Sequence, residues 1–402
     1  MRLFRHPIHA GPGHPSRHRP GLRLGAGLLL ALGGMPAAAA PDSAPDYGGA
    51  STSQCIPFAN PQSVAFTDPP KLNFSIGDST TIHTVTMDTG SVGIALAAPL
   101  IPGFEGLKAK GSPGTQFLSS SKILWVGTWV PATVTLYDRD KQAVATAAVP
   151  VLGVERTGYC PAFQKTGQIC TDGMSPAKDV VYMGVGFGQE ADFQPQGTPD
   201  KNALLNLTSL NGKPIAPGSL NPGYIIGRQG IQVGLTAENS QGFRFTKLTP
   251  YAAYPGDWMM PQGCYSLNPE QNRAAAGPIC TPTPILVDTG IPQSYMTVPD
   301  GIRFDTVEEQ DKSDPKRKLP VLAPGTVVTI RLPVSGDPIA EAAFTMGGGS
   351  PVQPAQIIPD QTDKYPPFLN TGRHFLRQFQ YLYDARQGYV GMKPQPNPCG
   401  EG

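Results

Sequence analysis

The chain has 402 residues, a formal net charge of +1, 15% charged residues and 39% hydrophobic residues. This balance of charge excludes a strongly basic binding surface, so we expect neither nucleic acid nor an anionic membrane as a partner. The 47 glycines and 45 prolines leave only short runs between turn residues, which indicates a β-rich protein.

The first forty residues differ in composition from the rest of the chain. Five arginines and no acidic residue accompany the stretch "LGAGLLLALGGMPAAAA". A basic start, a short apolar stretch and small residues are typical of a secretory signal peptide, here residues 1–40. An uncleaved anchor is the alternative, but the stretch is shorter than the ~20 apolar residues that a membrane span needs.

We therefore expect cleavage near Ala40 or Pro41 and a secreted or periplasmic protein without stable membrane insertion. Loss of the five arginines changes the net charge from +1 to −4. The remaining length exceeds what one hydrophobic core usually serves, so two lobes are expected. We place them at residues 41–222 and 223–402, with the Pro- and Gly-rich "PIAPGSLNPGYIIG" as the crossover.

Short apolar runs predict strands along the whole chain. They are rich in β-branched and aromatic residues and are bounded by turn residues. In chain order they read "KLNFSIG", "HTVTM", "KILWVGTW", "ATVTLYD", "GIQVGLT", "TVVTIRLPV" and "QYLYD". Residues 199–212, "PDKNALLNLTSLNG", are the best helix candidate, whereas residues 267–278 and 308–318 are expected to be solvated loops.

Six cysteines follow the leader: Cys55, Cys160, Cys170, Cys264, Cys280 and Cys399. An even number in an exported chain favours disulfides. Pairing of neighbours predicts Cys160–Cys170 and Cys264–Cys280 and leaves Cys55 with Cys399, although six cysteines allow 15 connectivities. Since no CxxC spacing occurs and only two histidines follow the leader, we expect no metal site and no cofactor.

Two Asp-Thr-Gly sequences, each on the end of an apolar run, are the main chemical signal. They lie in "HTVTMDTGSVGIAL", residues 83–96, and "TPILVDTGIPQSYMTVP", residues 283–299. Two carboxyl groups within hydrogen-bond reach share one proton, so one can take a proton from a water while the other donates to a carbonyl. The alternative for each sequence is an ordinary turn at a strand end.

"LNFSIGDSTTIHTVTMDTGS", "ILVDTG" and the closing "GRHFLRQFQYLYDARQGYVGMKP" resemble the pepsin-like aspartic proteases, and the resemblance covers most of the chain after the leader. It implies an all-β, bilobal pepsin-like double-β-barrel fold with a central cleft that takes an extended peptide or protein substrate, in a monomer. It also implies a catalytic pair, Asp88 and Asp288. The residues expected to support the pair are Thr89, Gly90, Ser91, Thr289 and Gly290.

The chain departs from the family at three places. Ile291 follows the second glycine, so we expect Asp288 to lack the side-chain donor that Ser91 provides to Asp88, and to keep the shared proton. "LWVGTWVPATVTLYD" takes the place of the family's flap hairpin, with Val126 at the position of its tyrosine, and Asn370-Thr371 replaces two apolar residues. The flap candidates are Trp125, Val126, Gly127 and Trp129.

These features favour an exported aspartic endopeptidase, because both aspartates are present. The alternative is a catalytically weak or inactive pepsin-fold protein that binds a protein or glycan partner. Ile291 and the missing flap tyrosine favour this alternative.

Overall fold

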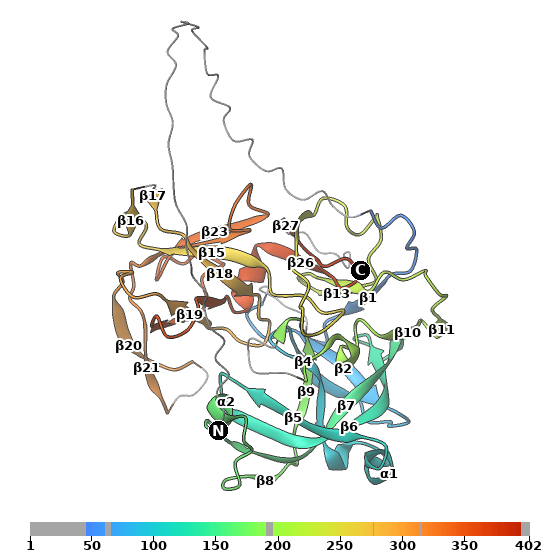
Figure 1. Ribbon diagram of the computed structural model, residues 1–402. Coiled ribbons are helices and arrows are strands. Elements are labelled where there is room, and N and C mark those ends of the chain that lie inside the picture. The colour runs from blue at the N-terminus through green and yellow to red at the C-terminus, as the bar shows by residue number, and fades with distance from the viewer. Residues whose placement is uncertain (1–45, 61–65, 190–195, 276, 313–315, 395–402) are drawn as a thin grey trace, which may run out of the picture. The chain divides into compact units, whose positions relative to one another are not determined.

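The computed structural model describes residues 46–60, 66–189, 196–275, 277–312 and 316–394. The predicted leader and Cys399 lie outside these residues. The described part is built from strands with a few one-turn helices (Figure 1). These helices are η1 (Ala98–Leu100), α1 (Phe104–Lys108), α2 (Phe163–Thr166), η3 (Pro199–Lys201) and η4 (Arg373–Arg377).

A ten-stranded sheet forms the first half, in the order β11-β10-β7-β4-β9-β3-β2-β6-β5 with β8 paired to β7. Because β6 pairs with β7 as well as with β2, the sheet curls and closes on itself. Its strands are β2 (Lys71–Ile76), β3 (His83–Asp88), β4 (Val92–Ala97), β5 (Ser112–Leu118), β6 (Ile123–Tyr137), β7 (Ala143–Tyr159), β8 (Ser175–Pro176), β9 (Val181–Val185), β10 (Leu207–Leu210) and β11 (Lys213–Pro214).

A seven-stranded sheet forms most of the second half, in the order β23-β22-β15-β18-β25-β19-β24. Two separate hairpins, β16–β17 and β20–β21, accompany it. The strands are β15 (Gln262–Leu267), β16 (Arg273–Ala274), β17 (Gly277–Pro278), β18 (Thr281–Leu286), β19 (Ser294–Val298), β20 (Thr306–Gln310), β21 (Lys318–Leu322), β22 (Val327–Leu332), β23 (Ala340–Thr345), β24 (Ile357–Gln361) and β25 (Phe368–Asn370).

A third, six-stranded sheet takes strands from both ends of the chain, in the order β1-β13-β12-β26-β27-β14. Its strands are β1 (Gln54–Pro57), β12 (Gly223–Ile226), β13 (Gly230–Val233), β14 (Arg244–Lys247), β26 (Phe379–Asp384) and β27 (Tyr389–Pro394). The predicted all-β, bilobal fold class is confirmed. The predicted boundary between the lobes at residue 222 stays a prediction. Strand β1 comes from the first half of the chain but pairs with β13 of the second half in this sheet.

Two expectations about local structure are wrong. The predicted helix at 199–212 is a single 3-10 turn, η3, followed by strand β10. The Asn202 side chain donates to the carbonyl of Val185 (2.8 Å) and accepts from the N–H of Leu204 (3.0 Å), so it competes with helical hydrogen bonding. The predicted loop at 308–318 begins and ends in the paired strands β20 and β21.

The same strand arrangement occurs in both sheets beside the Asp-Thr-Gly sequences. β9 lies between β3 and β4, parallel to the first and antiparallel to the second. β25 lies between β18 and β19 with the same directions. The strand that ends in each Asp-Thr-Gly turn, β3 or β18, therefore pairs with a strand from later in the same half, β9 or β25 respectively.

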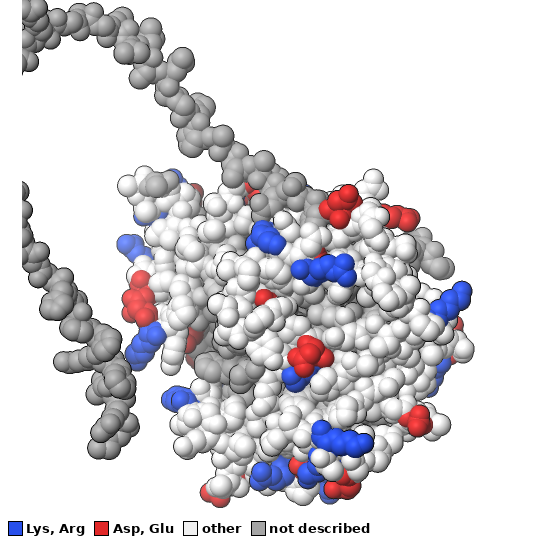
Figure 2. Space-filling model, turned by 45° about the vertical axis from the view of Figure 1, so that its right-hand side comes forward, with Lys and Arg blue, Asp and Glu red and all other residues white. Residues whose placement is uncertain are grey.

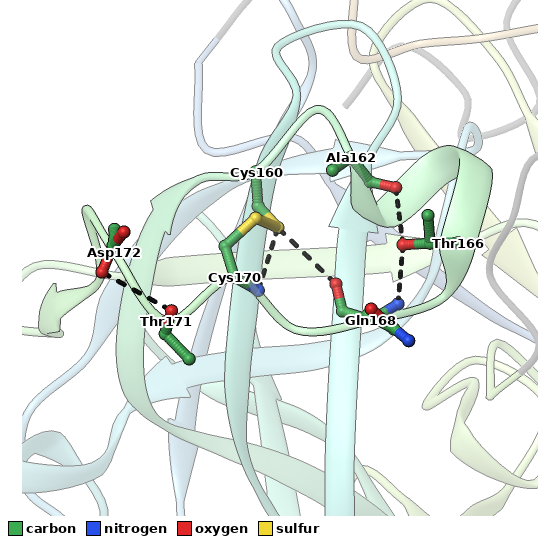
Figure 3. The surroundings of a disulfide bond; sticks show 7 residues. All are labelled: Cys160, Ala162, Thr166, Gln168, Cys170, Thr171 and Asp172. Atoms are coloured by element: carbon green, nitrogen blue, oxygen red, sulfur yellow. Dashed lines mark hydrogen bonds between the residues drawn. A yellow bond between two sulfur atoms is a disulfide. The ribbon is translucent and has the colours of Figure 1, made fainter.

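The disulfides Cys160–Cys170 and Cys264–Cys280 are confirmed. Cys399, the predicted partner of Cys55, lies outside the described residues, so that pairing stays a prediction. The first disulfide closes the loop that carries α2 (Figure 3), where the hydroxyl of Thr166 donates to the carbonyl of Ala162 (3.0 Å).

This loop supports the β5–β6 hairpin. The rings of Phe117 and Phe163 lie 5.5 Å apart, and the Lys122 ammonium donates to the Gln164 side chain (2.7 Å). The N–H of Cys160 donates to the carbonyl of Lys122 (2.8 Å). The disulfide thus holds the turn of the hairpin as well as its own loop.

The double variant Cys160→Ser/Cys170→Ser should lower the free energy of unfolding by up to about 3 kcal/mol, because the unfolded chain gains conformational entropy when the disulfide no longer closes its loop. Urea unfolding followed by tryptophan fluorescence measures the change, since Trp125 and Trp129 lie in the same sheet. An unchanged unfolding midpoint would contradict the expected contribution. Ser→Ala at the exposed Ser121 serves as the neutral control.

Candidate active site

The two Asp-Thr-Gly turns are joined by hydrogen bonds between their threonines. The N–H of Thr89 donates to the hydroxyl oxygen of Thr289 (3.0 Å), and the N–H of Thr289 donates to that of Thr89 (3.0 Å). Each hydroxyl in turn donates across to the other half, Thr89 to the carbonyl of Val287 and Thr289 to the carbonyl of Met87, both at 2.5 Å. Both side chains are buried, and each donates and accepts, so the turns are locked in one register.

This lock brings the carboxyl groups of Asp88 and Asp288 together. The N–H of Gly90 donates to Asp88 Oδ1 and the N–H of Gly290 donates to Asp288 Oδ1, both at 2.8 Å. A Cβ atom at Gly90 would lie 2.6 Å from Asp288 Oδ2, and one at Gly290 would lie 2.5 Å from Asp88 Oδ1. Only glycine leaves room for the carboxyl group of the opposite half, which is why both sequences carry it.

The pKa of Asp288 lies well above its usual range. Burial, which disfavours the charged carboxylate, is the main cause. The charge of Asp88 and a hydrogen bond with its carboxyl group raise the pKa further, while the Asn370 amide and the N–H of Gly290 act in the opposite direction. Asp288 therefore keeps its proton to a higher pH than an ordinary aspartate.

Two hydroxyl groups donate to the outer oxygen of Asp88. Ser91 Oγ lies 2.6 Å from Asp88 Oδ2, the contact expected from the sequence. The hydroxyl of Tyr182, a residue that the sequence analysis did not single out, donates to the same oxygen. Burial and then the charge of Asp88 raise the pKa of Tyr182 well above its usual range, so its hydroxyl keeps its proton and remains a donor.

The expectation that Asp288 lacks a side-chain donor is wrong. The amide of Asn370 donates to Asp288 Oδ2 at 2.7 Å, and its own oxygen accepts the N–H of Gly372 (2.9 Å), which orients the amide. Ile291 provides no hydroxyl, but the donor comes from a strand that is distant in sequence. The polar Asn370 in a position where the family prefers an apolar residue was the signal for it.

Tyr182 and Asn370 occupy the same place in the two halves. Tyr182 pairs with Ala95 of β4, and Asn370 pairs with Tyr295 of β19; both partners lie seven residues after the aspartate of their half. The inserted strand of each half thus delivers one side-chain donor to its own aspartate. Asp88 accepts from the phenol of Tyr182 and the hydroxyl of Ser91, whereas Asp288 accepts from the amide of Asn370. The environments of the two carboxyl groups are therefore unequal.

The pair lies in a cleft of about 680 Å³. Both aspartates, both turn glycines, Tyr182 and Asn370 line it. The remaining lining residues are Lys71, Thr84, Val85, Thr86, Leu118, Ser119, Ser120, Lys122, Gln164, Val181, Ile291, Tyr295, Arg317 and Phe368.

The structure places the predicted flap residues away from this cleft. The turn of the β5–β6 hairpin is residues 119–122, and its Leu118, Ser119, Ser120 and Lys122 line the cleft. Trp125, Val126, Gly127 and Trp129 lie further along β6 and are absent from the lining.

Packing accounts for the positions of these four residues. Trp125 and Trp129 are buried in a cluster with Ala95 and Leu152. A Cβ atom at Gly127 would lie 1.9 Å from the carbonyl oxygen of Gly153, and Val126 pairs with Thr115. These four residues hold the β5–β6 hairpin against the sheet, and the turn of the hairpin faces the cleft.

Within the described ranges, no group of three or more His, Cys, Asp and Glu side chains is arranged to hold a metal ion. The same part of the chain contains no helix of the length and hydropathy that a membrane span requires. On the face shown in Figure 2, Lys and Arg alternate with Asp and Glu, and most of the surface carries neither.

No protein-family model matches the chain, and no curated protein matches it. Among solved structures, the chain is similar to the aspartic proteinase from Irpex lacteus, with 13% identity and a TM-score of 0.43 over 86% of this chain and 98% of that chain. At this TM-score the likeness carries no argument about activity, so the case for a function rests on the residues of the site.

Replacing Asp288 by Asn should stabilise the protein at neutral pH. In the unfolded chain Asp288 ionises near its ordinary pKa of 3.8, whereas in the folded protein it keeps its proton to higher pH. The wild type therefore loses stability as the pH rises from the lower pKa through the higher one. The variant escapes this loss, which amounts to about 1.4 kcal/mol for each unit by which the pKa is raised.

Thermal unfolding between pH 3 and pH 7 measures this effect. We expect Asp288→Asn to gain stability over the wild type only above about pH 4, where the unfolded carboxyl group ionises. Asp140→Asn, at an exposed position, is the control and should show no such trend. A difference that is constant across the pH range would contradict the raised pKa of Asp288.

Proposed function

We propose that the protein is an exported aspartic endopeptidase, a divergent member of the pepsin-like aspartic protease family. It hydrolyses peptide bonds through a water activated by Asp88 and Asp288. The observation that supports this most is the buried carboxyl pair in the cleft, held by reciprocal threonine hydrogen bonds, with the pKa of Asp288 raised by burial and by Asp88. The substrate is an extended peptide or protein segment laid across the cleft beneath the β5–β6 turn.

In the proposed reaction the two aspartates have different roles. Asp88, which accepts hydrogen bonds from Gly90, Ser91 and Tyr182, is the ionised base and takes a proton from the attacking water. Asp288 donates its proton to the carbonyl oxygen as the water oxygen bonds to the carbonyl carbon. The tetrahedral intermediate then breaks its C–N bond: Asp88 gives its proton to the leaving nitrogen, and one hydroxyl of the intermediate returns a proton to Asp288, which restores the pair without a covalent enzyme intermediate.

Preorganisation is the main contribution of the chain to this reaction. Tyr182 and Asn370 lie on β9 and β25, strands that are paired on both sides, so these donors need no rearrangement as charge shifts. The two disulfides and the predicted signal peptide are compatible with a location outside the cytoplasm. We propose that the protein is secreted or exported to the periplasm as a monomer.

The second candidate is a protein that binds a peptide or a glycan in this cleft without cutting it. Tyr182 favours this possibility, because its hydroxyl already donates to Asp88 Oδ2, an oxygen adjacent to the place where an attacking water must be held. The endopeptidase is preferred because both carboxyl groups are present and unequal in environment, as the proton transfers require.

The variants Asp88→Asn and Asp288→Asn should each abolish peptide cleavage, because each removes one of the two proton-transferring groups. Digestion of a mixed peptide library between pH 2 and 7, read by mass spectrometry, measures this. A statine-type transition-state mimic should block the wild type, since it binds where the activated water sits. Full activity of Asp288→Asn would contradict the role proposed for this carboxyl group, whereas a wild type that cuts no peptide would favour the binding protein.

The variant Tyr182→Phe should move the acidic limb of the pH–rate profile upward, because Asp88 loses a hydrogen bond that stabilises its charged form. Tyr295→Phe is the matched control, because Tyr295 lines the same cleft on the other half. A faster turnover with an unmoved acidic limb would contradict a supporting role and show that the phenol obstructs the water site.

A further inference from the structure

We infer that η4 forms an acid-sensitive clamp behind the second Asp-Thr-Gly turn, and that protonation of His374 breaks the contact that holds Arg377 in it. The residues Arg373, His374 and Arg377 are called the η4 clamp below. The inference goes beyond the proposed function because it concerns the pH range in which the surroundings of the second turn stay in place. It needs no peptide cleavage.

Arg373 joins the second turn to a segment from the start of the chain. Its guanidinium donates to the carbonyls of Phe66 (3.2 Å) and Thr67 (3.0 Å), and to the carbonyl of Gly290 at 3.5 Å. Its backbone N–H donates to the carbonyl of Ile291 (3.0 Å). The side chain is buried, so one residue connects two backbones that are distant in sequence.

Arg377 contacts the same early segment and a third one. It donates to the hydroxyl of Thr67 (3.2 Å) and to the carbonyl of Pro351 (3.1 Å). The segment of Pro351 continues to Ala355, whose N–H donates to the carbonyl of Pro292 (2.9 Å), just after the second turn. Arg377 therefore helps to hold two segments that surround this turn.

The two hydrogen-bond partners of His374 fix its protonation state. Nδ1 lies 2.8 Å from the carbonyl oxygen of Gln353, which can only accept a hydrogen bond. Nε2 lies 3.1 Å from Nη2 of Arg377, which can only donate one. Nδ1 must therefore carry the proton and Nε2 must accept, so the imidazole is neutral in this arrangement.

A second proton on the imidazole removes its contact with Arg377. The imidazolium has no acceptor, so its Nε2–H would face an N–H of Arg377 across the same 3.1 Å, and two positive charges would meet. Among the described residues, the charged groups that act on His374 are Arg377 and Arg373, both positive, while the carboxylates of Asp68 and Asp288 act on Arg373. Protonation therefore drives Arg377 away from His374.

The pH at which the clamp opens follows from the burial of the imidazole. Burial lowers the pKa of His374 to about 4, and the charges of Arg377 and Arg373 lower it further, against the effect of the Gln353 carbonyl. In the unfolded chain the histidine has its ordinary pKa of 6.5. Between these values only the unfolded chain binds the extra proton, so stability falls as the pH falls from about 6.5 to about 4.

The variant His374→Gln should remove this pH dependence, because glutamine keeps a donor and an acceptor but does not titrate. Thermal unfolding of the full chain between about pH 3.5 and pH 7.5 measures it. We expect the unfolding midpoint of the wild type to fall by a few degrees more than that of the variant as the pH falls from 6.5 to 4. The same pH dependence in both proteins would overturn the inference.

The variant Arg377→Met distinguishes the clamp from a buried histidine without one. Beside His374, its loss of stability should be smaller at about pH 3.5 than at pH 7, because the contact is already broken in acid. In the His374→Gln background the loss should be equal at both pH values. Arg244→Met is the matched control, because this exposed arginine donates to the carbonyl of Pro338 (2.6 Å), and its effect should not depend on pH.

A loss of stability in Arg377→Met that is the same at both pH values, with His374 present, would overturn the clamp even if His374→Gln behaves as expected. None of these measurements requires cleavage of a peptide. An inactive protein with the expected unfolding behaviour would contradict only the proposed peptidase activity.

Discussion

The reciprocal hydrogen bonds between Thr89 and Thr289 are the constraint on which the rest of the site depends. The hydroxyl of each threonine accepts the N–H of the other threonine and donates to a backbone carbonyl of the other half, Val287 or Met87. Neither turn can therefore shift without leaving buried polar groups unpaired. The two halves, which also share the six-stranded sheet, are thereby joined at the two Asp-Thr-Gly turns. The carboxyl groups of Asp88 and Asp288 meet because the threonines beside them do.

The site combines a symmetric frame with asymmetric chemistry. β9 and β25 enter the two halves in the same way, and each presents a donor to its own aspartate. Tyr182 differs from Asn370 in size, acidity and the number of its donors, and Ser91 has no counterpart at Ile291. A frame that is repeated in both halves therefore gives the two carboxyl groups different hydrogen-bond partners.

The wall of the cleft depends on packing at a distance from the aspartates. Phe117 and Phe163 hold the β5–β6 hairpin against the disulfide loop, and the buried Trp125 and Trp129 hold it against the sheet. The hairpin turn, which Lys122 also ties to the disulfide loop, then places Ser119, Ser120 and Lys122 at the cleft.

The sequence by itself determined the strand-rich fold, the two disulfides between near neighbours and the two Asp-Thr-Gly turns. These follow from local signals, because alternating apolar runs, short cysteine spacings and a repeated tripeptide are legible within a few residues. It failed at residues 199–212, where the Asn202 side chain bonds to a carbonyl of another strand and competes with the helix. It also placed the flap several residues too far along β6, since the turn is made of serines that carry no distinctive signal.

Only the tertiary structure identified Tyr182 and Asn370 as donors to the two aspartates. Tyr182 lies 94 residues from Asp88 and Asn370 lies 82 residues from Asp288, and each comes close because an inserted strand pairs beside the turn. Strand pairing over such separations depends on the whole sheet and not on local composition. The sequence thus pointed to the two carboxyl groups, and the sheets decided which side chains donate to each of them.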